Sequence, residues 1–262
     1  MSAPAASPPP IGVVIVGDEI LSGKRQDKHL AHAIATLGRR GLGVDRASYV
    51  GDDRARLTGL FRDSFARGEL VFSFGGIGAT PDDQTRQAVA AALGVPLEPH
   101  PGAVAEIVAR FGPEAHPHRI RMAEFPAGAD LIPNPFNGVA AFSVRDHHFF
   151  PGFPQMAWPM MEWVLDTRYP HLRRECAVER AIAVYDVGES QLLPLMDENV
   201  ARFPDVKLFS LPAFLPGGGR RIELGVRGPR ADADAALDHL VEGVRKAGHR
   251  YEPLDPAPER TP

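Results

Sequence analysis

The sequence is short of the features that mark several classes of protein. It has a single cysteine, Cys176, in 262 residues, so it forms no internal disulfide, and a disulfide-stapled scaffold is excluded. Positive charge is not in excess, because 29 Lys and Arg stand against 33 Asp and Glu, and a net charge of −4 argues against a nucleic-acid partner. No apolar run reaches the ~18 residues of a membrane span. We therefore expect a cytoplasmic protein with neither a nucleic-acid nor a membrane partner.

The composition that remains is that of a globular chain. Hydrophobic residues make up 44% of the sequence and charged residues 24%, which is ordinary for a folded protein with a sizeable core. The first ten residues have neither the basic nor the apolar segment of a secretory signal. Together with its length, this composition predicts one large domain or two modest ones.

Short apolar runs alternate with amphipathic stretches in the first two thirds of the chain. Runs without polar alternation are typical of strands buried on both faces of a parallel sheet. The predicted strands are Ile11–Gly17, Gly43–Val50 and Leu70–Phe74, and the predicted helices are Asp27–Leu37, Asp52–Phe65, Pro81–Leu93, 101–111, 117–124 and Gln155–Asp166. A hairpin is expected over residues 142–150, with Asp146, His147 and His148 around its turn. The pattern indicates an α/β fold with three layers, in which helices cover both faces of a mostly parallel sheet.

The pattern changes after about residue 170. A run of strand, helix, strand, strand and helix predicts a small α+β module of about 70 residues. Its elements are Val178–Val187, Ser190–Phe203, Val206–Leu211, Arg221–Arg227 and Ala231–Lys246. The predicted organisation is a disordered tail over 1–10, an α/β domain over 11–170, the small module over 176–248 and a Pro-rich, disordered tail over 249–262. The apolar strands of the module predict a homodimer.

The strongest local signal lies where the third strand ends. Gly75, Gly76 and Gly78 fall within four residues, which lets backbone N–H groups converge on an anion. We expect Thr80 to be the N-cap of the following helix, with Pro81 at its first position. In open α/β sheets ligands bind outside the carboxyl ends of the strands, so a phosphate site is predicted here.

Carboxylates flank this predicted phosphate site. Asp82 and Asp83 would lie in the first helical turn, where they either complement the helix dipole or hold a divalent cation. Asp18 and Glu19 follow the first strand and would converge on the same point if that strand neighbours the third. Glu19 is then either a second metal ligand or part of a solvated turn. The histidines at 116, 118, 147 and 148 suggest exposed loop residues more than metal ligands.

Several segments together resemble one known family. The run Gly75–Asp83 (GGIGATPDD) resembles the signature of the molybdopterin-binding superfamily, which contains MoaB, Mog and gephyrin-like domains. Val16–Gly23 (VGDEILSG), Pro133-Asn134-Pro135 with Gly138, and Phe150–Pro154 (FPGFP) more closely resemble the N-terminal part of competence/damage-inducible protein A, CinA. The resemblance covers roughly residues 11–247. Ala79 departs from it, since proline is usual at that place.

The resemblance implies a ligand and a reaction. CinA-type N-terminal domains are associated with divalent-metal-dependent ADP-ribose pyrophosphatase activity, and the wider superfamily binds molybdopterin. Either ligand, a nucleotide or a pterin phosphate, has a phosphate and a heteroaromatic ring. The glycine loop would therefore suit both ligands equally well. The family's C-terminal amidase domain is not expected in this chain.

The resemblance also implies roles for particular residues. Asp82 and Asp83 would be catalytic, and Asp83 with Glu19 would bind Mg²⁺ or another divalent cation. The residues expected to contact the ligand are Gly75, Gly76, Gly78, Thr80, Asp18, Glu19, Ser22, Asn134, Gly138, Pro151 and Gly152.

Overall fold

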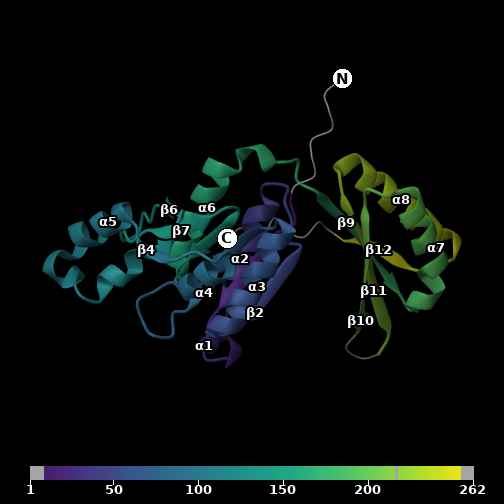
Figure 1. The fold of residues 1–262 in the computed structure, drawn as a ribbon. Coiled ribbons are helices and arrows are strands. Elements are labelled where there is room, and N and C mark those ends of the chain that lie inside the picture. Colours follow the sequence, from purple (N-terminus) through teal and green to yellow (C-terminus); the bar gives the residue numbers. More distant parts are fainter. Residues whose placement is uncertain (1–8, 216–217, 255–262) are drawn as a thin grey trace, which may run out of the picture. The chain divides into compact units, whose positions relative to one another are not determined.

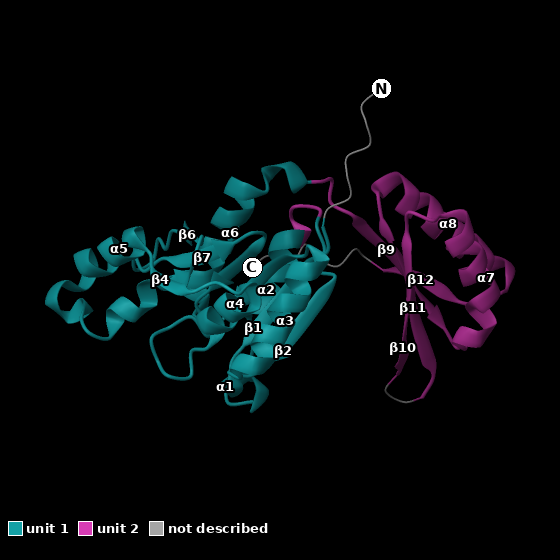
Figure 2. Ribbon diagram, in the orientation of Figure 1, with its two compact units in different colours: residues 1–37, 42–173 teal, residues 38–41, 174–262 magenta. Residues whose placement is uncertain are grey.

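A six-stranded sheet forms the centre of the larger of two units in the chain. The computed structural model describes residues 9–215 and 218–254. Unit 1 comprises residues 1–37 and 42–173, and unit 2 comprises residues 38–41 and 174–262 (Figures 1 and 2). In the described part of the chain, no helix is both long and apolar enough to cross a membrane.

The sheet of unit 1 is mostly parallel. Its strand order is β2-β1-β3-β8-β7-β6, and β7 is antiparallel to both of its neighbours while the other strands run one way. The strands are β1 (Ile11–Val16), β2 (Arg46–Val50), β3 (Leu70–Phe74), β6 (Asp130–Ile132), β7 (Ala141–Val144) and β8 (His147–Phe150). The predicted hairpin over residues 142–150 is confirmed as β7 and β8, and β8 in addition pairs in parallel with β3.

Helices cover both faces of this sheet. Every residue of β1, β3, β7 and β8 is buried, which requires a layer on each side. The helices of unit 1 are α1 (Asp18–Leu21), α2 (His29–Gly38), α3 (Arg54–Arg67), α4 (Thr85–Leu93), α5 (Pro101–Phe111) and α6 (Pro154–Arg168). The predicted α/β class with a mostly parallel sheet is therefore confirmed.

Some boundaries of unit 1 differ from the predicted ones. The predicted helix over 117–124 is wrong, because the chain there forms the short 3₁₀ segment η2 (Arg119–Ala123), which follows η1 (Gly112–Ala115), and then enters a strand. That strand, β5 (Glu124–Pro126), pairs with β4 (Leu97–Pro99) in a separate two-stranded sheet. Strands of three residues are too short to show a periodicity, so they could not be predicted from the residues alone. A further 3₁₀ turn, η3 (Pro170–Leu172), follows α6.

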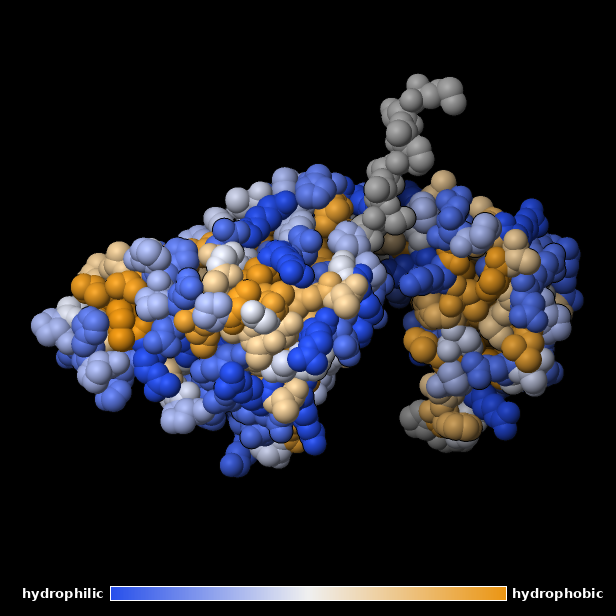
Figure 3. Space-filling view, viewed as in Figure 1, coloured by the Kyte–Doolittle hydropathy of each residue, from blue (hydrophilic) through white to orange (hydrophobic). Residues whose placement is uncertain are grey.

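Unit 2 is a four-stranded antiparallel sheet with two helices. The strand order is β10-β11-β9-β12, and α8 contacts β9 and β11 while α7 contacts β10. Its elements are β9 (Val178–Tyr185), α7 (Glu189–Arg202), β10 (Lys207–Phe214), β11 (Arg220–Gly228), α8 (Arg230–Lys246) and β12 (Tyr251–Leu254). On the face drawn in Figure 3, hydrophobic residues gather over this sheet.

The predicted tail over 249–262 is wrong in part. Tyr251–Leu254 forms β12, which pairs with β9 at the sheet edge. Pro253 falls on this strand, and proline is tolerated at an edge because one side needs no hydrogen bond. The remainder of that tail, 255–262, and most of the predicted N-terminal tail lie outside the described residues.

Candidate functional site

The glycine loop lies where the chain order of the sheet reverses. From β1 the chain passes first to β2 on one side and then to β3 on the other. The carboxyl ends of the three parallel strands therefore meet at one edge, with Ile15 beside Phe74 and Val16 beside Val50. Such a switch point is the usual ligand site of an open α/β sheet.

The carbonyl groups of the loop are held by two residues of α4. Gly76 O accepts a hydrogen bond from Thr85 N at 2.9 Å, and Gly75 O accepts one from the Thr85 hydroxyl at 3.1 Å. Gly78 O accepts one from Arg86 Nη2 at 2.6 Å. Arg86 is only 1% exposed, and it also donates to Arg121 O and Glu124 O. Burial lowers the pKa of Arg86, and Glu124 and Asp83 oppose that effect.

This arrangement leaves amides of the loop without a protein acceptor. In a trans peptide the C=O of one residue and the N–H of the next point in opposite directions. Since the carbonyls of Gly75, Gly76 and Gly78 are held by α4, the next N–H groups point away from those contacts. Within the described residues, the amides of Gly76, Ile77, Gly78 and Ala79 donate to no protein acceptor, whereas Gly75 N donates to Phe150 O at 2.9 Å. Consecutive unpaired amides of this kind suit an anion.

Two of the glycines are required by the backbone. Gly75 has φ of 102°, and a Cβ there would lie 2.2 Å from Val16 O. Gly76 has φ of 70°, and a Cβ there would lie 2.3 Å from the Thr85 hydroxyl oxygen. A side chain at either position would combine unfavourable backbone with steric overlap. The glycines therefore let the loop pack tightly on β1 and α4.

The predicted start of the following helix is wrong. The helix was expected from Pro81 with Thr80 as its N-cap, but α4 begins at Thr85 and Gln84 is its N-cap. The Asp83 carboxylate accepts from Thr80 N at 2.9 Å and from the Thr80 hydroxyl, so these two residues close a separate turn. Asp82 and Asp83 thus lie in a turn that precedes α4 and not in its first helical turn. The local hydrogen bond of the Asp83 side chain competes with helix initiation at this point.

Four carboxylates lie close enough to influence one another at this edge. Asp18 N donates to Asp52 Oδ2 at 3.0 Å, and Asp52 N donates to Asp18 Oδ1 at 3.3 Å, so the loops after β1 and β2 are joined. Burial raises the pKa of Asp52, and the charges of Asp18, Glu19 and Asp82 raise it further, while the Asp18 amide opposes the shift. We call Asp18, Glu19, Asp52 and Asp82 the acidic cluster. A bound cation would relieve the repulsion that the other three charges exert on Asp52.

The acidic cluster is not a complete metal cage. Among the described residues, no group of three His, Cys, Asp or Glu side chains is arranged to hold a metal ion. A magnesium ion nevertheless fits such a donor set, because it commonly takes one or two carboxylates together with oxygens of a substrate phosphate. Ser22 is the C-cap of α1, and its hydroxyl makes a 3.4 Å contact with Glu19 O.

The loop over Pro151 and Gly152 abuts the glycine loop. A Cβ on Gly152 would lie 3.7 Å from the Gly75 Cα, the one contact such an atom would make. Gly152 O accepts a hydrogen bond from His29 Nε2 at 3.2 Å, and the His29 ring stacks on Phe74 with ring centroids 4.6 Å apart. Burial lowers the pKa of His29, and the contact with Gly152 and the charge of Asp27 oppose it. A neutral, buried histidine therefore fastens this loop to α2 and β3.

Asn134 and Gly138 form a tight turn at the same edge. The Asn134 amide donates to Asn137 Oδ1 at 2.8 Å and to Val139 O at 3.0 Å, while its oxygen accepts from Phe136 N at 3.0 Å. Gly138 has φ of 68° and its N–H donates to Asn134 O. The Asn134 side chain is thus used within its own turn, so its predicted contact with a ligand stays a prediction.

The adjacent histidines of β8 are not exposed loop residues, contrary to expectation. His147 and His148 are at most 1% exposed. His147 Nε2 lies 2.7 Å from Ser64 Oγ, and His148 lies between Ser143 Oγ at 2.7 Å and the Tyr169 hydroxyl at 2.8 Å. Burial lowers the pKa of each to about 3. His147 begins β8, at the opposite end of this four-residue strand from Phe150 and the candidate site.

Sequence reasoning missed the residues that support the site. Thr85 and Arg86 fix the glycine loop, Asp52 joins the acidic cluster, and His29 holds Gly152. Asp52 follows a predicted strand, as Asp18 does, so the sequence already indicated that it could lie at the same edge of the sheet. Arg86 gave none, because an arginine in a helix is usually solvated.

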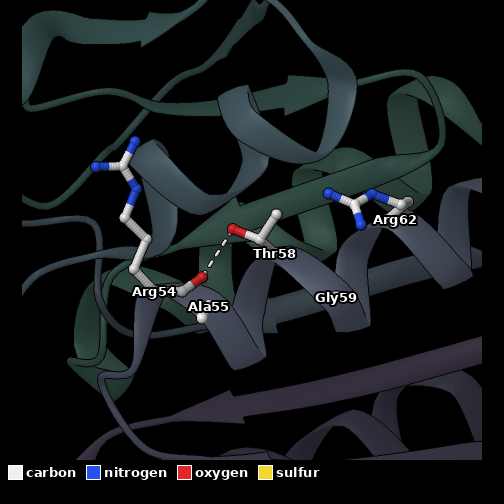
Figure 4. A pocket seen from close by; sticks show the side chains of 5 residues that line it. All are labelled: Arg54, Ala55, Thr58, Gly59 and Arg62. Carbon is white, nitrogen blue, oxygen red and sulfur yellow. Dashed lines mark hydrogen bonds between the residues drawn. The ribbon is translucent and has the colours of Figure 1, made fainter.

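A separate hollow lies on α3. Arg54, Ala55, Thr58, Gly59 and Arg62 line it, and the Thr58 hydroxyl donates to Arg54 O at 2.7 Å (Figure 4). None of the predicted site residues lines this hollow. It is open and shallow, so the glycine loop at the sheet edge is the better candidate site.

Comparison with known proteins now adds to this geometry. Residues 12–173 match the family model described as "Probable molybdopterin binding domain". The chain belongs to the molybdopterin-binding-domain family. The matched span contains the glycine loop, the acidic cluster and the Gly152 loop, and it confirms the resemblance stated from the sequence.

Individual relatives place the chain near CinA within this family. It is 34% identical over 247 residues to a CinA-like protein of Anaeromyxobacter sp. (strain Fw109-5), covering 89% of this chain and 59% of that one. It is 30% identical over 248 residues to a CinA-like protein of Geobacter sp. (strain M21), covering 91% and 58%. The chain thus spans about three fifths of the length of these curated relatives. A crystal structure of CinA from Thermoplasma acidophilum, described as of unknown function, matches 60% of this chain and 96% of that chain with 29% identity and a TM-score of 0.55.

Proposed function

We propose that this CinA-related domain protein is a divalent-metal-dependent pyrophosphohydrolase of a nucleotide pyrophosphate, ADP-ribose or a similar compound. The observation that carries the proposal is the set of unpaired loop amides beside the acidic cluster. The amides suit a phosphate, and the carboxylates suit a cation that neutralises it. Hydrolysis of ADP-ribose adds water across the P–O–P linkage and gives AMP and ribose 5-phosphate.

The protein groups have distinct parts in this proposal. The amides of Gly76 to Ala79 hold one phosphate, and Thr85 and Arg86 keep those amides in place. One or two carboxylates of the acidic cluster, with Asp52 and Asp82 as the first candidates, supply oxygens for Mg²⁺ or a similar ion. Such an ion, when bound, polarises a phosphoryl oxygen and lowers the pKa of a bound water. Asp83, whose carboxylate closes the turn at Thr80, stays a predicted ligand that the same test includes.

The test is product formation from ADP-ribose. The full chain is incubated with ADP-ribose and Mg²⁺, Mn²⁺ or no added metal, and AMP is quantified by chromatography. We expect metal-dependent AMP release, and a loss of roughly 100-fold or more in Asp52→Asn and Asp82→Asn, because each removes charge stabilisation at the phosphoryl group. Asp63→Asn on the exposed side of α3 is the matched control and should retain full activity.

Two results would count against the proposal. Wild-type protein that releases no AMP with any metal is not this hydrolase. Full activity in both Asp52→Asn and Asp82→Asn would separate the reaction from the acidic cluster. Full activity in Asp83→Ala would remove only that residue from the proposed site.

A second candidate is a binding protein for a pterin phosphate. The description of the matching family model favours it, and the loop amides suit that phosphate equally well. Calorimetry with molybdopterin or its adenylylated form separates the candidates. Tight binding without turnover would support this one over the hydrolase.

We also propose that the chain assembles as a homodimer through unit 2. Strand β10 is an edge of its sheet and exposes Leu211 and Phe214, which supports pairing with a second copy. Light scattering on the full chain tests this, and a mass of 28.4 kDa at all concentrations would reject it.

A further inference from the structure

Two phenylalanines at the edge that bears the glycine loop are exposed. Phe153 is 53% exposed and Phe136 is 60% exposed, although large apolar side chains are usually buried. Neither ring forms a ring contact or a cation–π contact with another residue in the described part of the chain. Their ring faces are therefore available to a ligand.

The sheet topology brings both residues to the candidate site. Strand β8 is parallel to β3, so its carboxyl end at Phe150 lies at the same edge as Phe74. Strand β7 is antiparallel to β8, so its first residue, Ala141, lies at that edge too. Phe153 comes three residues after β8, and Phe136 lies in the turn that leads into β7. Both are thus on loops that border the carboxyl edge of the parallel strands.

Direct contacts tie these loops together. Gly152 abuts Gly75, and Phe153 is the next residue, about 3.8 Å further along the chain. Asn137 Nδ2 lies 3.4 Å from Met156 Sδ, and Met156 N donates to Phe153 O at 3.0 Å. The turn that carries Phe136 therefore packs on the first turn of α6, where Phe153 is the N-cap.

We propose that Phe153, with Phe136 from the neighbouring turn, binds the heteroaromatic ring of the phosphate ligand. This rests on the proposed phosphate site in the glycine loop. A phosphate held by the amides of Gly76 to Ala79 places the rest of its ligand next to the Gly152 loop. A flat ring gains by stacking on an exposed aromatic side chain, whatever its hydrogen-bonding edge. The site therefore takes ring-bearing phosphate esters in preference to ring-free sugar phosphates.

The test uses two probes that differ only in the ring. AMP and ribose 5-phosphate are both 5′-phosphate esters of ribose, and neither has the P–O–P linkage that the proposed reaction cleaves. Calorimetry on the full chain, with Mg²⁺ present, gives both dissociation constants. We expect wild-type protein to bind AMP roughly 5- to 100-fold more tightly than ribose 5-phosphate, as stacking on an aromatic residue provides.

Substitutions assign that preference to the two rings. Phe153→Leu should reduce the preference to within a factor of about three, and Phe136→Leu should reduce it by a smaller factor, because its turn reaches the glycine loop only through α6. Ribose 5-phosphate should bind both variants as it binds wild type. Phe153→Tyr keeps an aromatic face and should restore the preference. Phe214→Leu, at a phenylalanine of unit 2 that is 86% exposed, is the control and should change neither constant.

The outcomes separate this inference from the proposed function. If wild type binds both probes equally, or if Phe153→Leu keeps the preference for AMP, the ring subsite is rejected while the phosphate site stands. If Phe153→Leu weakens the binding of both probes by the same factor, Phe153 supports the loop and binds no ring. If wild type binds neither probe, the phosphate site itself is rejected, and the ring subsite with it.

Discussion

The two units bury polar side chains to very different extents. Unit 1 buries His29, Glu69, Arg86, Asn134, His147 and His148, among others, whereas Asn199 is the one buried polar residue recorded among the described residues of unit 2. Of these, His29, Arg86 and Asn134 donate hydrogen bonds to loops at the carboxyl edge of the unit 1 sheet. The sheet of unit 2 has helices α7 and α8 on its strands and a largely apolar core. Buried polar groups are therefore concentrated in the unit that contains the candidate site.

Lowering the pH should cause the largest loss of stability, and mainly in unit 1, because the buried histidines lie there. Burial lowers the pKa of His147 and of His148 to about 3 in the folded protein, below the ordinary histidine value of 6.5. The unfolded chain thus binds more protons between these values, and stability is lost as the pH falls from 6.5 towards 3. Each histidine contributes about 1.4 kcal/mol per pH unit in this window.

Urea unfolding between pH 7 and pH 4 measures that loss. The variant His147→Gln with His148→Gln should show a shallower pH dependence than wild type. His239→Gln in unit 2, whose ring lies 3.4 Å from the Glu198 carboxylate, is the control and should leave the slope of unit 1 unchanged. An unchanged slope in the double variant would contradict the assignment.

Removal of the buried guanidinium should have the next largest effect. Arg86→Met leaves the carbonyls of Gly78, Arg121 and Glu124 without their donor, and we expect a loss of about 3–5 kcal/mol in the free energy of unfolding. In unit 2, Asn199→Leu removes donors to Ala236 O and to His239, and about 1–3 kcal/mol should be lost. Urea denaturation measures both. Equal losses in the two variants would show that Arg86 beneath the glycine loop stabilises the protein no more than Asn199 does.

Glycine substitutions test how strongly each unit depends on the backbone conformation of a single residue. Gly75→Ala places a Cβ 2.2 Å from Val16 O at φ of 102°, and we expect about 2–4 kcal/mol of destabilisation together with loss of phosphate binding. Gly248→Ala, in unit 2, has φ of 75° and no atom within 4 Å of the added Cβ, so it should cost only about 1 kcal/mol. Thermal unfolding compares the two. A similar loss of stability in both variants would show that the close packing of the glycine loop adds nothing to the effect of Gly75→Ala.

Exposed side chains should give the smallest effects in both units. Arg62→Ala at the hollow on α3 and Val200→Ala on α7 remove side chains that have no packed surroundings. Each should change the free energy of unfolding by no more than about 0.5 kcal/mol. A larger effect of Arg62→Ala in urea denaturation would show that the hollow on α3 is part of the folded core.

Much of the fold could be predicted because its signals are local. The unbroken apolar runs at Ile11–Val16 and Leu70–Phe74 gave β1 and β3, and the spacing of Leu57, Phe61 and Phe65 gave α3. The signals failed where side chains override propensity. Asp83 bonds to Thr80 and delays α4 by four residues, and the Pro-containing Tyr251–Leu254 becomes a strand only because β9 offers a partner.

The sequence alone determined which peptide groups could form the site, because glycine suits both the positive φ and the close packing at Gly75 and Gly76, and glycine is visible in the sequence. It also determined that carboxylates follow the strands. The tertiary structure decided which of them meet: Asp52 joins Asp18 across two loops, while Asp83 turns back on Thr80. It also decided that Arg86 is buried beneath the loop, since hydrogen bonds to carbonyls of three separate segments depend on how those segments pack and leave no pattern along the chain.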